Sequence, residues 1–174
     1  AVDFAEQGNL VALAIKPTSA HTGYGYIKSA DKLNEFGFKI ETFVEKPDQK
    51  TAEAFFNAGD YNWNSGIYIV KASVYLEELN KFYPQINELC SEAWDKREND
   101  LNFIRIDQHA SARCPDISID YAVSEKTDKG VVVPYEGDWS DVGSWDSVWT
   151  LSKKDEHDNA CFGNTFIENS KGSY

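Results

Sequence analysis

Short apolar runs typical of β-strands alternate along this chain with longer segments of helical periodicity. The strand-like runs occupy Leu10–Ile15, Phe38–Val44, Gly66–Val70 and Gly130–Pro134. The helical segments are Thr51–Asn57, Val74–Phe82, Gln85–Lys96, Ile117–Glu125 and Ser144–Leu151. This alternation predicts an α/β fold, in which helices cover the faces of a sheet.

Size and charge limit the kinds of partner. The 174 residues fit one domain with a substantial core, and the formal charge of −12 disfavours nucleic acid or an anionic membrane as the main partner. A phosphorylated small molecule is compatible with this charge if a divalent metal and one or two local lysines offset it.

Cysteine usage and hydropathy indicate a cytoplasmic compartment. The three cysteines are scattered without a Cys-x-x-Cys pair, as expected for reduced thiols, and the apolar runs are too short to span a bilayer. The chain lacks methionine and opens in a helix-like stretch, so we expect an N-terminal portion to precede it. A homo-oligomer is compatible with the sequence, which does not specify the oligomeric state.

Several well-known catalytic signatures are absent. The sequence contains neither a P-loop nor a Gly-x-Ser-x-Gly elbow, and Lys28 stands where a dinucleotide fingerprint needs its third glycine after Gly23 and Gly25. The three histidines are isolated from one another in the sequence, as structural histidines commonly are.

Polar residues at the ends of apolar stretches form the most suggestive pattern. Glu45 and Lys46 follow one strand, Asn64 precedes another, and Asp141 lies before the closing helix. Together they suit a phosphorylated, hydroxyl-rich ligand, because carboxylates and amides pair with hydroxyls, lysine with phosphate and aspartate with a metal. Each also has a purely structural interpretation, such as a turn-forming Asn64 or an Asp141 that caps the helix after Ser144.

Five motifs, in this order and spacing, resemble those of the bacterial mannose-1-phosphate guanylyltransferases, which are sugar nucleotidyltransferases. The motifs are Thr22-Gly-Tyr-Gly-Tyr-Ile27, Phe43-Val-Glu-Lys-Pro47, Trp63-Asn-Ser-Gly66, Ile117-Ser-Ile-Asp-Tyr-Ala-Val123 and Trp139-Ser-Asp-Val-Gly-Ser-Trp145. The resemblance covers residues 1–151 and implies a Rossmann-like α/β/α sandwich with a mixed, mostly parallel sheet. It implies that residues 1–151 bind the sugar phosphate and that 152–174 lead toward a β-rich segment.

The resemblance also implies a reaction and a role for each matched residue. Mannose 1-phosphate and GTP would give GDP-mannose and pyrophosphate by in-line transfer without a protein nucleophile. Glu45 and Asn64 correspond to sugar-binding residues and Lys46 to the lysine that meets the sugar phosphate. Gly25, with Tyr24 beside it, corresponds to a glycine whose backbone approaches the sugar.

For the two aspartates of the later motifs the resemblance says less. Asp141 corresponds to a carboxylate that binds Mg²⁺ and, with Lys46, acts in catalysis. Asp120 could be structural or face the ligand. The family's glycine-rich triphosphate loop has no counterpart here, so we expect a fragment that is inactive alone. The alternatives are a non-catalytic sugar-phosphate-binding module and a nucleotidyltransferase for another sugar or base.

Overall fold

The computed structural model describes all residues from 1 to 174, and its internal contacts divide the chain into two compact units, 1–137 and 138–174. The sequence placed a functional boundary at residue 151, and whether 138–151 belong to the sugar-phosphate-binding part stays a prediction. None of the helices combines the length and the apolar character that crossing a membrane requires.

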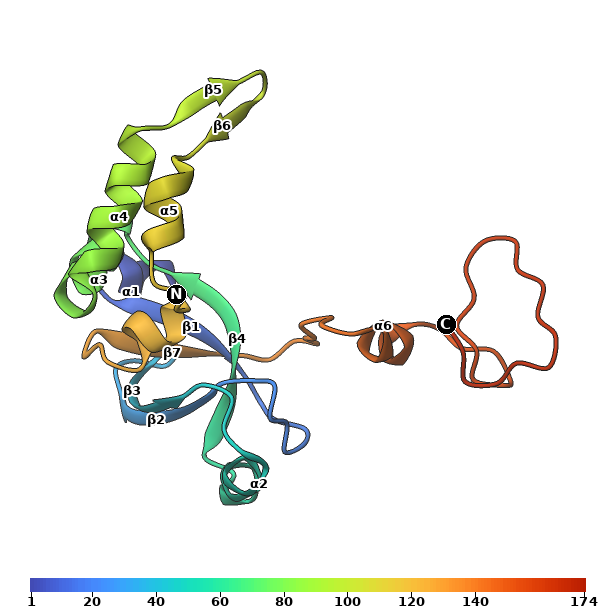
Figure 1. Cartoon of the computed structure of the whole chain (residues 1–174). Helices are drawn as coiled ribbons and strands as arrows, with labels where there is room; N and C mark the ends of the chain where they lie inside the picture. Colours follow the sequence, from blue (N-terminus) through green and yellow to red (C-terminus); the bar gives the residue numbers. More distant parts are fainter. The chain divides into compact units, whose positions relative to one another are not determined.

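The first unit contains seven strands and six helical segments (Figure 1). The strands are β1 (Leu10–Ile15), β2 (Tyr26–Lys32), β3 (Phe38–Val44), β4 (Tyr61–Ile69), β5 (Glu98–Asp100), β6 (Phe103–Arg105) and β7 (Gly130–Tyr135). The helices are α1 (Val2–Glu6), α2 (Gln49–Ala58), α3 (Ala72–Phe82), α4 (Pro84–Asp95), α5 (Gln108–Arg113) and the π-helical turn η1 (Asp120–Ser124).

Five strands close on themselves in the order β1-β4-β2-β3-β7. The α/β class and the mixed sheet are confirmed, but only β1 and β7 pair in parallel, whereas the other four pairings are antiparallel. The expectation of a mostly parallel sheet is therefore wrong for this chain. The short loop between β2 and β3 permits only an antiparallel pair, and the long path from β1 to β7 is what allows a parallel one.

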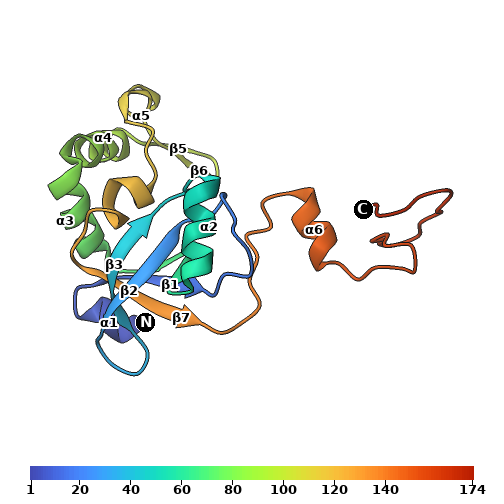
Figure 2. The same ribbon diagram turned by 90° about the horizontal axis from the view of Figure 1, so that it is seen from below.

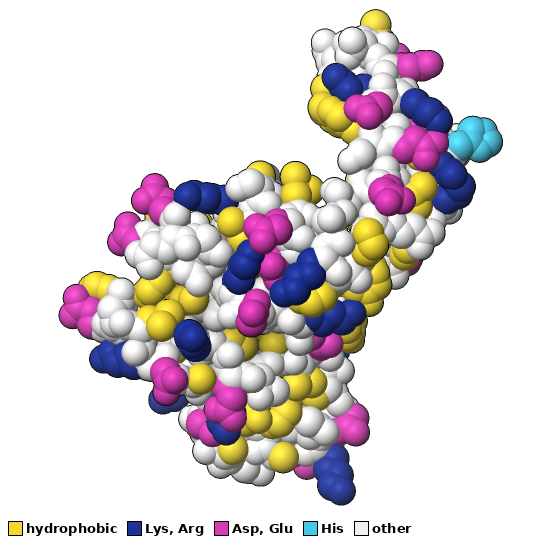
Figure 3. Space-filling model, turned by 90° about the vertical axis from the view of Figure 1, so that its left-hand side faces the viewer, with side chains coloured by type: hydrophobic (Ala, Val, Ile, Leu, Met, Phe, Trp, Pro, Cys, Tyr) yellow, Lys and Arg dark blue, Asp and Glu magenta, His cyan; other side chains and the backbone are white.

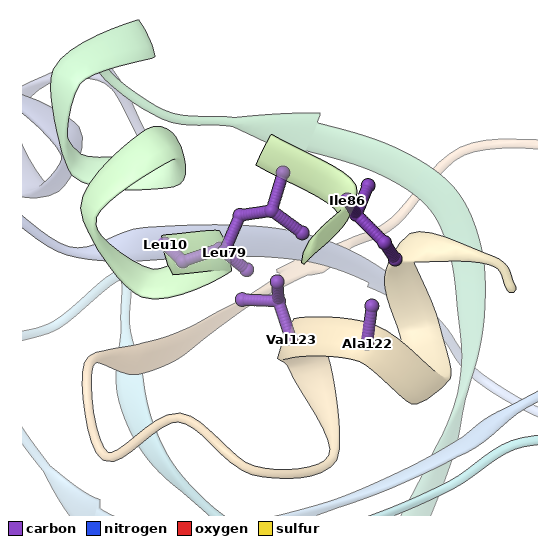
Figure 4. Close-up of a cluster of buried hydrophobic side chains, with 5 residues drawn as sticks. All are labelled: Leu10, Leu79, Ile86, Ala122 and Val123. Carbon is purple, nitrogen blue, oxygen red and sulfur yellow. The ribbon is translucent and has the colours of Figure 1, made fainter. Parts of the chain in front are cut away.

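The largest core cluster fastens the helices to the sheet. Figure 4 shows its five side chains converging from β1, α3, α4 and η1. These residues are Leu10, Leu79, Ile86, Ala122 and Val123. Two side chains of η1, Ala122 and Val123, are buried in this cluster, so hydrophobic packing fixes the position of η1. The other residues of η1 are free of this packing and can lie toward other parts of the unit.

Residues 97–113 form the least expected part of the first unit. The sequence predicted neither the β5–β6 hairpin nor α5, which with α4 extend away from the five-stranded ring (Figures 1 and 2). Every residue of the two strands is exposed, so the alternation that marks half-buried strands is absent. On α4, Ile86, Leu89 and Ala93 are buried, whereas Cys90 and Trp94 are exposed.

Acidic and basic side chains are interspersed over the face shown in Figure 3. The net charge of −12 is therefore not gathered into one acidic patch on this face.

In the second unit, Ser144 caps the single helix α6 (Trp145–Leu151) by accepting a hydrogen bond from the Ser147 amide. Residues 152–174 contain no helix or strand, but they are ordered around the buried Asn159. The Asn159 side chain bonds Asp155 and two backbone groups near the end of the chain.

Candidate functional site

A bulge in β4 explains the Asn-Ser-Gly sequence of the third motif. The pairing of β4 with β1 shifts register here, so that residues 65–67 lie opposite Leu13 alone. The Ser65 hydroxyl donates to the Leu13 carbonyl at 2.7 Å, and the Asn64 Oδ1 atom accepts from the Gly66 amide at 3.1 Å. Gly66 has φ +73°, a conformation that favours glycine. Bulges of this kind redirect side chains beside functional sites, and here the redirected residue is Asn64.

Gly25, Glu45 and Asn64 meet at one point of the first unit. The Gly25 carbonyl accepts from the Asn64 amide at 2.7 Å. A Cβ atom at Gly25 would lie 2.5 Å from Glu45 Oε2 and 3.2 Å from Asn64 Cβ. Only glycine allows both side chains to approach the backbone this closely.

Aromatic rings flank this point. Tyr24 stacks on His21 with a centroid distance of 4.0 Å and meets the edge of Trp63 at 5.0 Å. The buried Tyr26 hydroxyl donates to the His21 carbonyl, which ties the loop before β2 to the sheet. The Trp63 Nε1 atom is buried without a hydrogen-bond partner, so part of this wall remains polar but unsatisfied.

Glu45 and Lys46 lie on a turn that η1 and the residue after it hold in place. The Glu45 amide donates to Glu125 Oε1 at 2.9 Å, and the Tyr121 hydroxyl donates to the Glu45 carbonyl at 3.4 Å. Lys46 has φ +45°, which is uncommon for a residue with a Cβ atom. Its Nζ atom lies 3.4 Å from Glu45 Oε1, and its side chain is 60% exposed whereas that of Glu45 is 9% exposed.

The surroundings of Glu45 disfavour its charged form. Burial raises the pKa of the Glu45 carboxyl, and the negative charges of Asp120 and Glu125 raise it further. Lys46 acts in the opposite direction through its charge and hydrogen bond. Glu45 therefore takes up a proton at a higher pH than an ordinary glutamate, and a polar ligand that pairs with the carboxylate would relieve this cost.

Asp120, whose role the sequence left open, is hydrogen-bonded to a residue of the site and to a tyrosine of β4. Its Oδ1 atom accepts from the Tyr68 hydroxyl at 2.6 Å and from Asn64 Nδ2 at 3.1 Å. Ser124 Oγ donates to the same tyrosine hydroxyl at 3.1 Å. Burial, and then the neighbouring Asp120, raises the pKa of Tyr68 far above its ordinary value, so the phenol stays protonated.

Asp141 lies in the second unit, in a locally folded turn. A Cβ atom at Gly143 would lie 2.7 Å from Asp141 Oδ2, so this glycine lets the carboxylate fold back over the chain. Val142 between them has φ +51°, a strained conformation for a β-branched residue, and its amide donates to Ser140 Oγ at 3.2 Å. The helix cap is Ser144, so Asp141 does not have that structural role.

The chain alone does not assemble a complete metal site. No group of three or more His, Cys, Asp or Glu side chains is placed to hold an ion. A single carboxylate such as Asp141 still suits Mg²⁺, which commonly takes one or two protein carboxylates and completes its octahedron with phosphate oxygens and water.

The sequence missed the residues that hold the site together. Gly25, Glu45, Lys46 and Asn64 come together as a group, with Tyr24 on the adjoining aromatic wall. The supporting residues Tyr68, Ser124 and Glu125 were not singled out. Glu125 contacts Glu45 across 80 positions of sequence, and Ser124 contacts Tyr68 across 56. Tyr68 lies only four positions from Asn64, but its bond to Asp120 spans 52 positions, and no local pattern indicates such long-range contacts.

The nucleotidyl transferase family model matches residues 1–158. The chain belongs to this family. Among curated proteins, a mannose-1-phosphate guanylyltransferase from Salmonella muenchen is 49% identical over 98% of this chain and 36% of its own length. The chain spans about a third of the length of the curated relatives it matches.

Two solved structures share the fold of this chain at more than 30% identity. A mannose-1-phosphate geranyltransferase from Thermus thermophilus has 31% identity and a TM-score of 0.74, covering 91% of this chain and 44% of the other. A mannose-6-phosphate isomerase from Helicobacter pylori has 32% identity and a TM-score of 0.72, covering 81% and 55%.

Proposed function

We propose that the chain is the sugar-phosphate-binding part of a mannose-1-phosphate guanylyltransferase. The observation that carries this proposal is the convergence of the Glu45 carboxylate and the Asn64 side chain on Gly25, with Lys46 beside them. A carboxylate and an amide can pair with neighbouring sugar hydroxyls, and an exposed ammonium can pair with a phosphate.

Mannose 1-phosphate is the substrate that this group of residues and the relatives favour together. Three of the proteins similar to this chain act, by name, on a mannose phosphate. The high identity to a guanylyltransferase over nearly the whole chain supports GTP as the second substrate, ahead of another sugar or base. A non-catalytic binding module is the other function class, and the same pocket would serve it.

In the proposed reaction an oxygen of the sugar phosphate attacks the α-phosphorus of GTP. A new P–O bond forms, the bond from the α-phosphorus to the bridging oxygen breaks, and pyrophosphate leaves. Such a transfer needs in-line positioning and charge neutralisation, not a protein nucleophile. Glu45 and Asn64 would orient the mannose, Tyr24 and Gly25 would border it, and Lys46 would neutralise its phosphate.

Mg²⁺ would supply the remaining positive charge, with Asp141 as one carboxylate ligand. The chain carries −12 and both substrates are anionic, so a lysine alone offers little compensation. A bound Mg²⁺ stabilises charge on transferring phosphates.

The test is calorimetric titration of the 174-residue chain with mannose 1-phosphate. Glu45→Gln should weaken binding about 10- to 100-fold, because a charged hydrogen bond to a hydroxyl contributes roughly 1.5–3 kcal/mol. Glu41→Gln is the matched control, because Glu41 lies on β3, which ends directly before Glu45, and it pairs with Lys28 instead. Absence of binding to the unmodified chain, or equal losses in both variants, would refute the proposal.

A further inference from the structure

Tyr68 and Asp120 touch the proposed site without forming its wall. Tyr68 lies on β4, four residues after Asn64, and Asp120 opens η1. Their hydrogen bond of 2.6 Å joins two elements that are 52 positions apart in the sequence. Neither residue has an assigned function, and the core packing of η1 does not need a polar pair at this position.

The direction of every hydrogen bond in this group is fixed by chemistry. An ionised carboxylate only accepts, so Tyr68 must donate its single proton to Asp120. The tyrosine oxygen can then only accept, and it does so from Ser124 Oγ at 3.1 Å and Asn64 Nδ2 at 3.2 Å. The raised pKa of Tyr68 keeps its phenol protonated, so that it remains a donor to the Asp120 carboxylate.

These hydrogen bonds fix the orientation of the Asn64 side-chain amide. The NH₂ group turns toward Asp120 and Tyr68, and Oδ1 turns toward the Gly66 amide. An isolated asparagine could exchange its oxygen and nitrogen by a half-turn of its side chain. Here the reverse orientation would aim the amide oxygen at a carboxylate and would leave the Gly66 amide facing an NH₂ group.

The same carboxylate acts electrostatically on Glu45. Asp120 is the negative charge that raises the pKa of Glu45 most, ahead of Glu125, and Lys46 opposes both. The Tyr68 hydroxyl disperses part of the Asp120 charge through its hydrogen bond. One pair thus influences both polar groups that would meet the sugar.

We propose that Tyr68 and Asp120 form a positioning pair that orients the Asn64 amide and adjusts the charge facing Glu45, and so sets which sugar 1-phosphate the proposed site prefers. This inference rests on the proposed function and extends it to the specificity of the same site. Neither residue touches the reacting atoms, so both act through Asn64 and Glu45.

The experiment measures dissociation constants of the 174-residue chain for mannose 1-phosphate and glucose 1-phosphate, which differ only at the 2-hydroxyl. Tyr68→Phe should weaken mannose 1-phosphate about 10-fold and lower the preference for mannose, as expected for losing a hydrogen bond to a charged group. Tyr75→Phe is the matched control, because Tyr75 is a partly buried tyrosine on α3 packed against the main core cluster. It should change neither constant.

Asp120→Asn gives a measurement, the pH dependence of binding, that would not change if Asp120 were only structural. Asparagine can still accept from Tyr68 and Asn64, so neutral-pH affinity should be largely kept. Removing the negative charge should lower the pKa of Glu45 and shift the acid limb of mannose 1-phosphate binding to lower pH. Asp120→Ala should lose both affinity and preference.

The outcomes separate this inference from the function on which it rests. If the unmodified chain binds neither sugar phosphate, both fail. If it binds, but Tyr68→Phe weakens both sugars equally, and Asp120→Asn leaves the acid limb unmoved, the positioning pair is wrong and the proposed function stands.

Discussion

The turn at Glu45 and the turn at Asp141 look alike in their backbones but are held in different ways. Each places an acidic residue directly before a residue of positive φ with a Cβ atom, Lys46 at +45° and Val142 at +51°. The first turn is held by side chains 76 and 80 positions away in the sequence. Around the second, the hydrogen bonds of Ser140 and Ser144 span two and three positions.

The two turns therefore differ in how much of the fold they depend on for their geometry. The Glu45 turn exists only when β3, β4 and η1 have packed, so it depends on the whole first unit. The hydrogen bonds of Ser140 and Ser144 beside the Asp141 turn are local to it. Substitutions at the two sites should therefore differ in what else they disturb.

A matched pair of glycine substitutions gives the largest expected effect. At both Gly25 and Gly143 an added Cβ atom would collide with a carboxylate oxygen, that of Glu45 or that of Asp141. Gly25→Ala should push the Glu45 carboxylate aside and weaken mannose 1-phosphate binding by more than about 100-fold, since it also crowds Asn64. Gly143→Ala should leave this binding unchanged.

Calorimetric titration with mannose 1-phosphate measures both variants, and circular dichroism verifies that both are folded. If Gly143→Ala abolished sugar-phosphate binding as Gly25→Ala is expected to do, the two turns would not act independently in binding.

The next effect separates metal contact from phosphate contact in a protein that carries this chain and catalyses the proposed transfer. Asp141→Asn should lower turnover and raise the Mg²⁺ concentration needed, because an amide is a weaker ligand for this ion than a carboxylate. Lys46→Gln should raise the requirement for mannose 1-phosphate at every Mg²⁺ concentration, because it removes a point charge from the phosphate.

Steady-state rates over a Mg²⁺ titration provide the measurement. An unaltered Mg²⁺ requirement in a folded Asp141→Asn variant would remove the metal assignment. If excess Mg²⁺ restored the activity of Lys46→Gln, Lys46 would be assigned to the metal-bound phosphates and not to the sugar phosphate.

The sequence was most informative where function and local structure coincide. The sequence located β1 and β7 closely because each buries a continuous apolar run, and it located β3 and α3 from alternating and helical periodicity. It failed at β5, β6 and α5, where exposed residues carry no burial pattern. It also did not indicate the mainly antiparallel pairing, since in the five-stranded ring a short loop fixes the direction of only β2 and β3, whereas the other pairs are joined through longer connections.

The same division runs through the candidate site. Motifs identified Gly25, Glu45 and Asn64, whose chemistry is visible in their residue types. Tyr68 escaped notice because a tyrosine on an amphipathic strand is ordinary in sequence. Its hydrogen bond with Asp120 appears only when β4 lies beside η1. Sequence motifs therefore named the groups that would touch a ligand, whereas the fold was needed to find the residues that orient them.

The smallest expected effect is on stability, and it has opposite signs at two glutamates. Because the pKa of Glu45 is raised in the folded state, its contribution to stability is fully present below the ordinary pKa of about 4.3 and is lost as the pH rises through the raised value. Glu45→Gln should therefore melt slightly above the unmodified chain at neutral pH, and the difference should vanish below about pH 4.

Glu92 on α4 supplies the opposite case. Hydrogen bonds from Lys96 and Arg113 lower its pKa, so its contribution is present above the ordinary glutamate pKa and is lost as the pH falls through the lowered value. Glu92→Gln should therefore melt slightly below the unmodified chain at neutral pH. Melting temperatures from pH 3 to 8 test both signs. If Glu45→Gln also lowered the melting temperature at neutral pH, the Glu45 carboxylate would stabilise the fold. The opposite signs expected for Glu45 and Glu92 would then be wrong.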